Sequence, residues 1–378
     1  MINKNIIALG FVSFFTDMAS AMVTTLLPIF VVYVLKEDVD KLGLIIAIST
    51  FVSYFFRFGF GYLSDKLQVV KPFVVLGYCI SALAKPMIAF SHTYTSVMFL
   101  RSFERMGKAI RSASKDSLLS SYSKDKSHGK TFGFHKMMDI AGELSGAFII
   151  YLVFVYVSKS ETIIRDIFMY TAIPGIIATI IAILFVKDVK YKKNGKITVL
   201  TQEDKKLYPV LFVYFIFIFF MISEQFFILR AKNIGYTLES IPLFIMLFTL
   251  IQTIVSYYGG ILSDKIGLFY TFSISFVFGI LSVCMLKINL WVSFSFLGLF
   301  TVLSLNAMRA YISEHSISKG YIFGIFYAGI AVFSSLGALV IGYIWKFYGF
   351  DYVYLFSMIG MISIFIFYIF KFITPPTK

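Results

Sequence analysis

Two short stretches decide how this chain folds. Residues 61–67 read GYLSDKL and residues 260–266 read GILSDKI, so five of the seven positions are identical. Each copy lies at the end of an apolar segment long enough to cross a bilayer, residues 42–62 in one case and 241–262 in the other. A repeat at a separation of about half the chain predicts a fold built from two related halves.

Weaker echoes of the same repeat surround these stretches. Phe132-Gly133 matches Phe323-Gly324, and Ser145-Gly146-Ala147 further along matches Leu336-Gly337-Ala338. Between the halves lies a polar, basic segment that contains VKYKKNGKITVLTQED. We therefore expect three parts: an N-terminal six-helix bundle (residues 1–186), a cytoplasmic basic linker (187–206) and a C-terminal six-helix bundle (207–378).

Composition gives the class of fold. Of the 378 residues, 59% are hydrophobic and only 14% are charged, against roughly 25% charged in an ordinary soluble domain. A spanning helix needs about 20 mostly apolar residues, and such stretches recur along the whole chain. The sequence predicts an all-α membrane protein of about twelve transmembrane helices in two pseudo-symmetric six-helix bundles. The expected spans are approximately 6–35, 42–62, 73–90, 95–113, 132–157, 167–186, 207–229, 241–262, 269–286, 292–312, 321–345 and 352–370.

The distribution of Lys and Arg predicts the orientation. With residues 108–136 assigned to a loop, the side that carries both termini holds 21 of the 34 basic residues, and the other side holds 8. Basic loops remain in the cytoplasm, so we expect a multi-pass protein of the cell membrane with both termini cytoplasmic. Topology then accounts for most of the net charge of +14, and we expect no nucleic-acid partner.

The Gly-x-Leu-Ser-Asp-Lys motif, after the second and eighth of twelve spans, resembles the signature of the major facilitator superfamily. The resemblance covers essentially the whole chain. In that family the carboxylate and basic residues of the motif form a cytoplasmic charge latch between the two bundles. The resemblance therefore implies a cytoplasmic gating role for six residues: Gly61, Asp65, Lys66, Gly260, Asp264 and Lys265.

Two features depart from the family pattern. The usual Gly-Arg-Arg after the first motif is Gln68-Val69-Val70 here, with a basic residue only at Lys71, which implies a weaker latch on that side. Gly142 and Gly146 have the spacing of the family's antiporter motif, but Ala147 stands in place of its proline. The direction of transport is therefore left open.

Ionisable residues inside the expected spans are the candidates for function. Such groups are costly in a membrane and usually face the interior of the bundle or a water-filled cavity. Eight of the ten belong to the N-terminal half, and the acids and bases are equal in number. They are Asp17, Arg57, Lys85, Arg101, Glu104, Arg105, Asp139, Glu143, Glu224 and Arg309. The coupling or substrate cavity is expected to involve Asp17, Arg57, Arg101, Glu104, Arg105, Asp139 and Glu143, while static salt bridges remain the simpler alternative for the set.

The fourth and fifth spans carry facing charged stripes. Arg101, Arg105 and Lys108 share one helix face, and so do His135, Asp139 and Glu143. Because consecutive spans run antiparallel, we expect a charged ladder in which Arg105 and Asp139 lie at similar depth. The His-Asp-Glu stripe also has the chemistry of a metal site, but the neighbouring bases oppose a cation, and we expect no metal there. His135 itself is expected to be solvated at the cytoplasmic end of its helix.

Asp17 lies near mid-membrane in the first span. It is either a proton carrier, provided that burial raises its pKa, or a fixed partner of Arg57. The C-terminal half offers fewer polar residues, and each is more simply explained by helix packing. They are Glu224, Gln225, Gln252, Asn306 and Arg309.

These features favour a secondary active transporter that moves a small solute by alternating access. The chain has no nucleotide-binding motif, and family analogy favours coupling to protons. The alternatives are a membrane-embedded lipid-modifying enzyme and a non-transporting membrane receptor. No nucleophile with its base and no phosphate-cradling glycine loop is recognisable, so we expect no enzyme activity and no cofactor. The expected partners are a small-molecule substrate, protons and the lipid bilayer, and the protein is expected to be a monomer.

Overall fold

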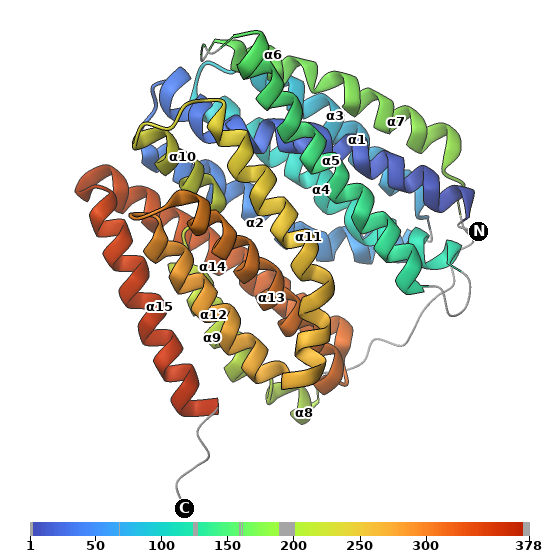
Figure 1. The fold of residues 1–378 in the computed structure, drawn as a ribbon. Helices are drawn as coiled ribbons and strands as arrows, with labels where there is room; N and C mark the ends of the chain where they lie inside the picture. The colour runs from blue at the N-terminus through green and yellow to red at the C-terminus, as the bar shows by residue number, and fades with distance from the viewer. Residues whose placement is uncertain are drawn as a thin grey trace, which may run out of the picture.

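The computed structural model describes residues 3–67, 69–123, 128–158, 160, 162–188 and 201–372. Every regular element within these ranges is a helix, and Figure 1 shows long helices that run side by side in one bundle. In lipid, a helix satisfies its own backbone hydrogen bonds, which an irregular segment cannot do. The all-helical class predicted from composition is confirmed.

The helices of the two halves follow one another in the same order. The N-terminal half contains α1 (Lys4–Ile29), η1 (Phe30–Val34), α2 (Val39–Leu67), α3 (Lys71–Met87), η2 (Ile88–Phe90), α4 (Tyr94–Tyr122), α5 (His128–Tyr156), α6 (Ile163–Tyr170) and α7 (Ala172–Phe185). After a short helix α8 (Gln202–Lys205), the C-terminal half contains α9 (Tyr208–Phe220), α10 (Glu224–Asn233), α11 (Ser240–Ile266), α12 (Leu268–Met285), α13 (Leu290–His315), α14 (Lys319–Tyr348) and α15 (Phe350–Phe372).

Within the described residues these helices make twelve spans. Four spans consist of two consecutive helices each, α1–η1, α3–η2, α6–α7 and α9–α10, and each of the other long helices is one span. Judged by length and composition alone, nine of the twelve spans could cross a membrane, and α11 and α12 contain shorter apolar helices. The remaining span is α4, which carries too many charged residues to meet the same criterion. The predicted number of spans is therefore confirmed.

The fourth span is longer than the sequence suggested. It was expected to end near Ala113, but α4 continues to Tyr122. The added turns are stabilised by tertiary contacts, because Leu118, Leu119 and Tyr122 are buried in a cluster with residues of α1 and α3. Basic residues that we assigned to a loop therefore lie on helices inside the bundle: Lys108, Arg111 and Lys115 on α4, and Lys136 on α5.

Glycines allow equivalent helices to approach closely in each half. A Cβ atom on Gly146 of α5 would lie 2.4 Å from the carbonyl oxygen of Met18 on α1, and one on Gly337 of α14 would lie 2.3 Å from that of Phe219 on α9. These glycines belong to the matched triplets of the repeat. Small residues permit such backbone contact between membrane helices, so the repeat in sequence corresponds to a repeat in packing.

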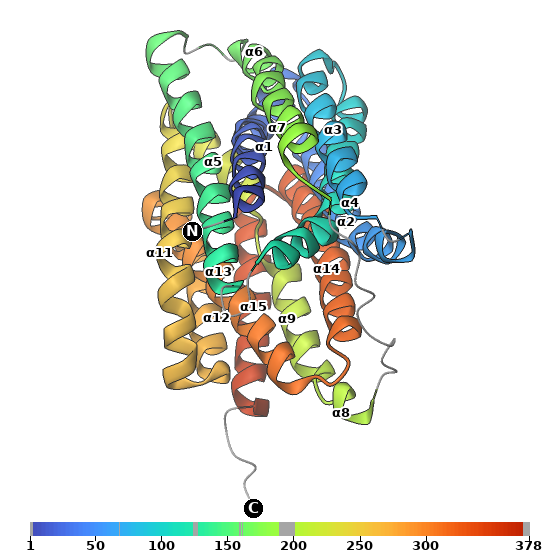
Figure 2. The same ribbon diagram turned by 90° about the vertical axis from the view of Figure 1, so that its right-hand side faces the viewer.

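The two halves meet along α2 and α14 and along α5 and α11; Figure 2 shows the second pair side by side. A Cβ atom on Gly43 would lie 2.7 Å from the carbonyl oxygen of Ala338 and 3.1 Å from the Cα atom of Gly342. Ser335 Oγ donates a hydrogen bond of 2.8 Å to the carbonyl oxygen of Ala47. These contacts lie toward the end of the bundle where α2 begins and α14 ends, which we call the opposite side.

The other end, where α1 begins and α15 ends, is the terminal side. Figure 1 shows the helix axes of the two halves diverging toward it. The repeated motifs end α2 and α11 there, and Asp65 and Asp264 each lie two residues before the end of their helix. The two aspartates thus occupy equivalent places in the backbone, as predicted. The side chains of Asp65, Gly260, Asp264 and Lys265 lie outside what the structure describes.

The short helix α8 is fastened to the C-terminal half. Thr201 and Asp204 form a capping box around it. The Asp204 carboxylate also accepts hydrogen bonds from the backbone N–H groups of Ile317 and Ser318, at 2.9 and 3.1 Å. Asp204 therefore links α8 to the connection between α13 and α14.

Candidate functional site

A polar cavity of about 110 Å³ lies inside the N-terminal half, between α1, α3, α4 and α5. Its lining is dominated by charged and hydroxyl-bearing side chains. The lining residues are Ser13, Thr16, Asp17, Tyr78, Lys108, Arg111, Ser112, Lys115, Lys136, Asp139 and Glu143. Ionisable groups within a membrane usually face the bundle interior or a water-filled cavity, so this cavity is the candidate functional site.

Helix α4 supplies the basic wall of the cavity, which consists of Lys108, Arg111 and Lys115. These residues are spaced by three and four positions, so they project from one helix face. Arg111 NH1 donates to Ser81 Oγ at 3.1 Å and to the carbonyl oxygen of Gly77 at 3.4 Å. Its guanidinium also lies over the Tyr78 ring, at 4.7 Å from the centroid. Arg111 is therefore held in place by neutral groups, and its charge is not cancelled locally.

The other two bases of the α4 wall differ in how they are held. Lys115 Nζ lies 3.3 Å from Ser13 Oγ on α1. Lys108 is exposed despite its position in the middle of α4, because its side chain lines the cavity. Among the described residues, the ammonium group of Lys108 makes no hydrogen bond or ion pair, so it is available to a ligand.

Helices α1 and α5 supply the acidic wall, which consists of Asp17, Asp139 and Glu143. Asp139 Oδ1 lies 3.2 Å from His135 Nδ1, one turn earlier on α5. Within the described part of the chain, Asp17 and Glu143 have no ion-pair partner. His135 is 4% exposed, so the expectation of a solvated residue was wrong; its contact with Asp139 accounts for the burial. No three His, Cys, Asp or Glu side chains among the described residues are gathered as metal ligands would be.

A second group of charges lies beside the cavity, deeper along α4. Glu104 Oε2 lies 2.9 Å from Arg101 NH1 and 3.5 Å from Arg105 Nε. Arg101 NH2 also donates to Thr24 Oγ1 on α1 at 2.8 Å. Arg101 and Glu104 are completely buried, whereas the Arg105 side chain is 21% exposed. Arg101 and Glu104 thus form a fixed pair, and Arg105 keeps access to open space.

A further buried base is tied to the backbone. Lys85 on α3 is fully buried, and its Nζ atom donates to the carbonyl oxygen of Thr16 at 3.0 Å. A lysine near the end of a span commonly extends its chain to water at the membrane surface. Lys85 does not, because its bond to the carbonyl oxygen of Thr16 anchors the ammonium group beside α1.

The expected ladder between the fourth and fifth spans is not formed. Arg105 pairs with Glu104 on its own helix, and Asp139 contacts His135 on its own helix. The reason is that α5 packs on α1: a Cβ atom on Gly142 would lie 2.2 Å from the carbonyl oxygen of Phe14. The cavity, and not a direct ion pair, lies between the two stripes.

The alternative partner for Asp17 is also excluded. Arg57 NH2 lies 3.2 Å from Asp116 Oδ2 on α4, and its guanidinium lies over the ring of Tyr327 on α14, at 5.0 Å. Arg57 therefore faces the boundary between the halves. Asp17 remains free to act in the cavity.

The C-terminal half contributes one carboxylate to this region, from a break in the seventh span. Helix α9 ends at Phe220 and α10 starts at Glu224. Glu224 lies within electrostatic range of Glu143 on α5 and of Arg101 and Arg105 on α4. The sequence singled out Glu224 as an intramembrane charge but did not place it in the site. The pair Ser223-Glu224, a favourable helix start, was the signal that could have revealed the break.

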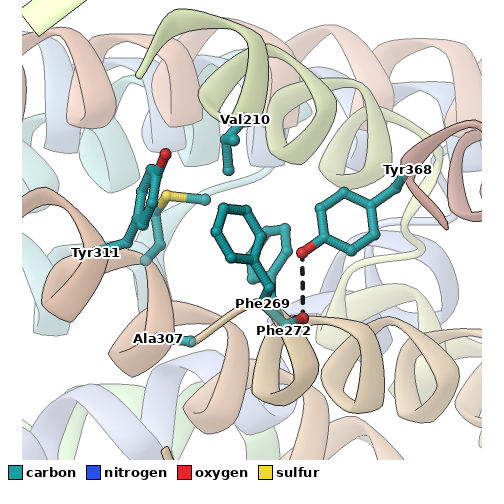
Figure 3. Close-up of a pocket in the computed structure, with 7 residues that line it drawn as sticks. Val210, Phe269, Phe272, Ala307, Tyr311 and Tyr368 are labelled. Carbon is teal, nitrogen blue, oxygen red and sulfur yellow. Dashed lines mark hydrogen bonds between the residues drawn. The ribbon is translucent and has the colours of Figure 1, made fainter. Parts of the chain in front are cut away.

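A small hollow in the C-terminal half has a different character (Figure 3). It measures about 10 Å³ and is lined mostly by apolar side chains of α9, α12, α13 and α15. Tyr368 closes it by donating a hydrogen bond of 3.1 Å to the carbonyl oxygen of Phe269. A space of this size holds at most one water, so it is a packing defect and not a solute site.

Comparison with known proteins agrees with this arrangement. A sequence model of the Major Facilitator Superfamily matches residues 9–316. The chain is 31% identical over 361 residues to a protein of Methanocaldococcus jannaschii described as "Uncharacterized MFS-type transporter MJ1317", covering 91% of this chain and 89% of the relative. This chain belongs to the major facilitator superfamily, and it is a transporter of that type.

Solved structures of other transporters share the fold. The nucleoside transporter NupG superposes with a TM-score of 0.79 at 13% identity, covering 97% of this chain and 99% of the other. A POT family transporter in complex with a thioalcohol-conjugated peptide gives 0.77 at 12% identity, with 97% and 96% covered. At these identities the likeness concerns the fold alone.

Proposed function

We propose that this protein is a secondary active transporter that moves a small solute across the cell membrane by alternating access, coupled to protons. The observation that carries the proposal is the charged cavity enclosed by α1, α3, α4 and α5 at membrane depth. A purely structural set of charges would be a costly substitute for apolar packing. A role in binding a solute or a proton would explain why the charges are present despite this cost.

Three sets of residues have separate roles in this proposal. Asp17, Asp139 and Glu143 line the cavity, with Arg105 beside them, and they bind the solute or the coupling proton. Arg57, Arg101 and Glu104 hold the surrounding helices in register. The motif residues Gly61, Asp65, Lys66, Gly260, Asp264 and Lys265 form the gate at the terminal side.

The contacts between the halves support alternating access. Packing of α2 against α14 closes the opposite side, through Gly43 and Gly342 and through the ion pairs of Lys346. In the proposed cycle, this conformation gives access to the cavity from the terminal side. Rocking of the N-terminal bundle (residues 1–186) against the C-terminal bundle (207–378), joined by the linker 187–206, would exchange the two arrangements.

The distribution of basic residues supports cytoplasmic termini. Four of the 21 bases counted on the terminal side line the cavity instead, namely Lys108, Arg111, Lys115 and Lys136. The 17 that remain still exceed the 8 of the opposite side, and basic segments stay in the cytoplasm. With the terminal side in the cytoplasm, the proposed conformation is inward-facing. We also propose that the protein acts as a monomer.

Purified protein in liposomes tests the function. Under an imposed pH gradient and without ATP, the protein should accumulate a solute from a metabolite mixture, and the accumulation should collapse when a protonophore is added. A strict requirement for ATP, or an indifference of uptake to the proton gradient, would refute the proposed coupling.

A further inference from the structure

The cavity of the N-terminal half has walls of opposite charge that do not touch. The basic wall, Lys108, Arg111 and Lys115, belongs to α4, and the acidic wall, Asp17, Asp139 and Glu143, belongs to α1 and α5. A fourth base, Lys136, also lines the cavity from α5, on the same helix as two of the three acids. Among the described residues, no ion pair joins the two walls. The bonds of Lys115 and Arg111 go to hydroxyl and carbonyl oxygens.

This separation has an electrostatic consequence. A carboxylate and an ammonium group in a membrane protein gain most when they are in contact, and each is costly when it has no partner. Among the described residues, the carboxylates of Asp17 and Glu143 and the ammonium of Lys108 face the same space without a direct ion pair, and they attract one another only across the cavity. A molecule that fills the space contacts both walls favourably when it offers negative charge to one and positive charge to the other.

We propose that this cavity binds a small zwitterionic solute, a molecule that carries one anionic and one cationic group. The proposal rests on the proposed transport function and names its substrate class. The anionic group lies against Lys108 and Arg111, and the cationic group lies against Asp17 and Glu143. A solute with a single charge satisfies one wall and leaves the other without a partner.

The size and the neutral lining agree with such a solute. A volume of about 110 Å³ exceeds that of one water, whose share of the liquid is about 30 Å³, and it suits a molecule of amino-acid size. Arg111 is oriented in advance by Gly77, Ser81 and Tyr78. Binding therefore costs little conformational entropy for ordering the Arg111 side chain.

Equilibrium binding to the full-length protein in lipid nanodiscs tests the proposal at pH 7. Three pools of probes of similar size are compared: α-amino acids with uncharged side chains, monocarboxylates from acetate to butyrate, and primary monoamines from methylamine to butylamine. At least one amino acid should bind saturably and raise the unfolding temperature, and the two single-charge pools should not. Binding of only carboxylates, only amines or none of the probes would overturn the proposal.

Charge-neutralising variants sharpen the test. Lys108→Gln and Asp17→Asn should each weaken binding of the amino acid at least tenfold, and Asp17→Asn combined with Glu143→Gln should shift the preference toward monocarboxylates. Lys206→Gln is the matched control, because Lys206 is an exposed residue that pairs with Glu203 outside the cavity. The comparison of probe pools with unmodified protein stands even if a variant does not fold.

The outcome of the binding experiment can be distinguished from the outcome of the transport experiment. Binding of an amino acid without transport in liposomes would contradict the transport proposal and leave the zwitterion site intact. Proton-driven transport of a solute with a single net charge would support the transport proposal and contradict the zwitterion site.

Discussion

Lys346 Nζ lies 2.9 Å from Asp38 Oδ2, so the last turns of α14 are tied to the segment that leads into α2. The same ammonium group lies 3.3 Å from Asp40 Oδ1. One helical turn earlier, Gly342 and Gly43 bring the two backbones into contact. Lys346 therefore completes the closure of the opposite side, where the two halves of the protein are joined.

Removing this ion pair should loosen the closed side. We expect Lys346→Gln to raise the fraction of molecules open at the opposite side a few-fold, because partly exposed ion pairs contribute modestly. The readout is labelling of Ala47→Cys by a membrane-impermeant thiol reagent, in a background with Cys79→Ser and Cys284→Ser. Ala47 is 2% exposed and is shielded while α2 and α14 remain packed.

A matched control lies on the same side of the membrane. Lys287 Nζ pairs with Asp351 Oδ1 at 2.6 Å, entirely within the C-terminal half. Lys287→Gln should leave the labelling rate unchanged. Equal labelling in both variants would show that the Lys346 pair does not hold the halves together.

The contact of α5 with α1 should tolerate no added atom at Gly142. A Cβ atom there would lie 2.2 Å from the carbonyl oxygen of Phe14, and overpacking of this kind costs about 1–3 kcal/mol. We expect Gly142→Ala to lower the unfolding temperature in detergent. Gly133→Ala, on the same helix with nothing within 4 Å of the added atom, should be neutral or slightly stabilising; a similar loss in both would contradict the packing argument.

The helical class and the number of spans could be predicted from the sequence, because the length of an apolar segment that crosses a membrane is set by the thickness of the bilayer. The repeated motifs at 61–67 and 260–266 then fixed the division into halves. The end of α4 was missed because its last turns are rich in Ser and Lys, and no local signal marks them as helix. Those turns depend on burial of Leu118, Leu119 and Tyr122 against other helices, which sequence periodicity does not report.

The structure brings three of the predicted site residues together, because Asp17, Asp139 and Glu143 line one cavity. Their role in coupling or substrate binding stays a prediction. The pairing of Arg105 with Asp139 was wrong because we assumed that consecutive helices are neighbours. Glycines 142 and 146 place α5 on α1 instead, and only three-dimensional packing shows which helices those glycines face.

The cap of α8 offers a test of the connection between the halves. We expect Asp204→Ala to lower the unfolding temperature and to increase protease cleavage near residue 200, since the N–H groups of Ile317 and Ser318 would lose their acceptor. Glu203→Ala is the neighbouring control, because Glu203 is 59% exposed and pairs with Lys206. Cleavage at the same rate in both variants would show that Asp204 does not anchor α8.

Arg101 and Glu104 should behave as a structural pair. Arg101→Met removes the closer partner of a buried carboxylate and leaves Arg105 Nε at 3.5 Å, and breaking a buried pair costs up to about 3–5 kcal/mol. We expect Arg101→Met to unfold far more readily than the unmodified protein, and we expect the double variant Arg101→Met/Glu104→Leu to recover much of the loss. Failure of the double variant to recover would mean that the pair also serves Arg105, the second partner of Glu104.

Glu224 provides the last prediction, because it is the carboxylate that the C-terminal half brings to the charges of the other half. It starts α10 at the break in the seventh span, within range of Glu143 and Arg105. Under the proposed rocking of the halves these distances would change, and a coupling proton bound near Glu143 would then be sensitive to the position of Glu224. We expect Glu224→Gln to leave the unfolding temperature within a few degrees of the unmodified protein but to reduce proton-driven uptake at least tenfold and to flatten its dependence on pH. Glu203→Gln, an exposed carboxylate on the terminal side, should change neither. Uptake by Glu224→Gln with the original pH profile would show that coupling is confined to Asp17, Asp139 and Glu143 in the N-terminal half.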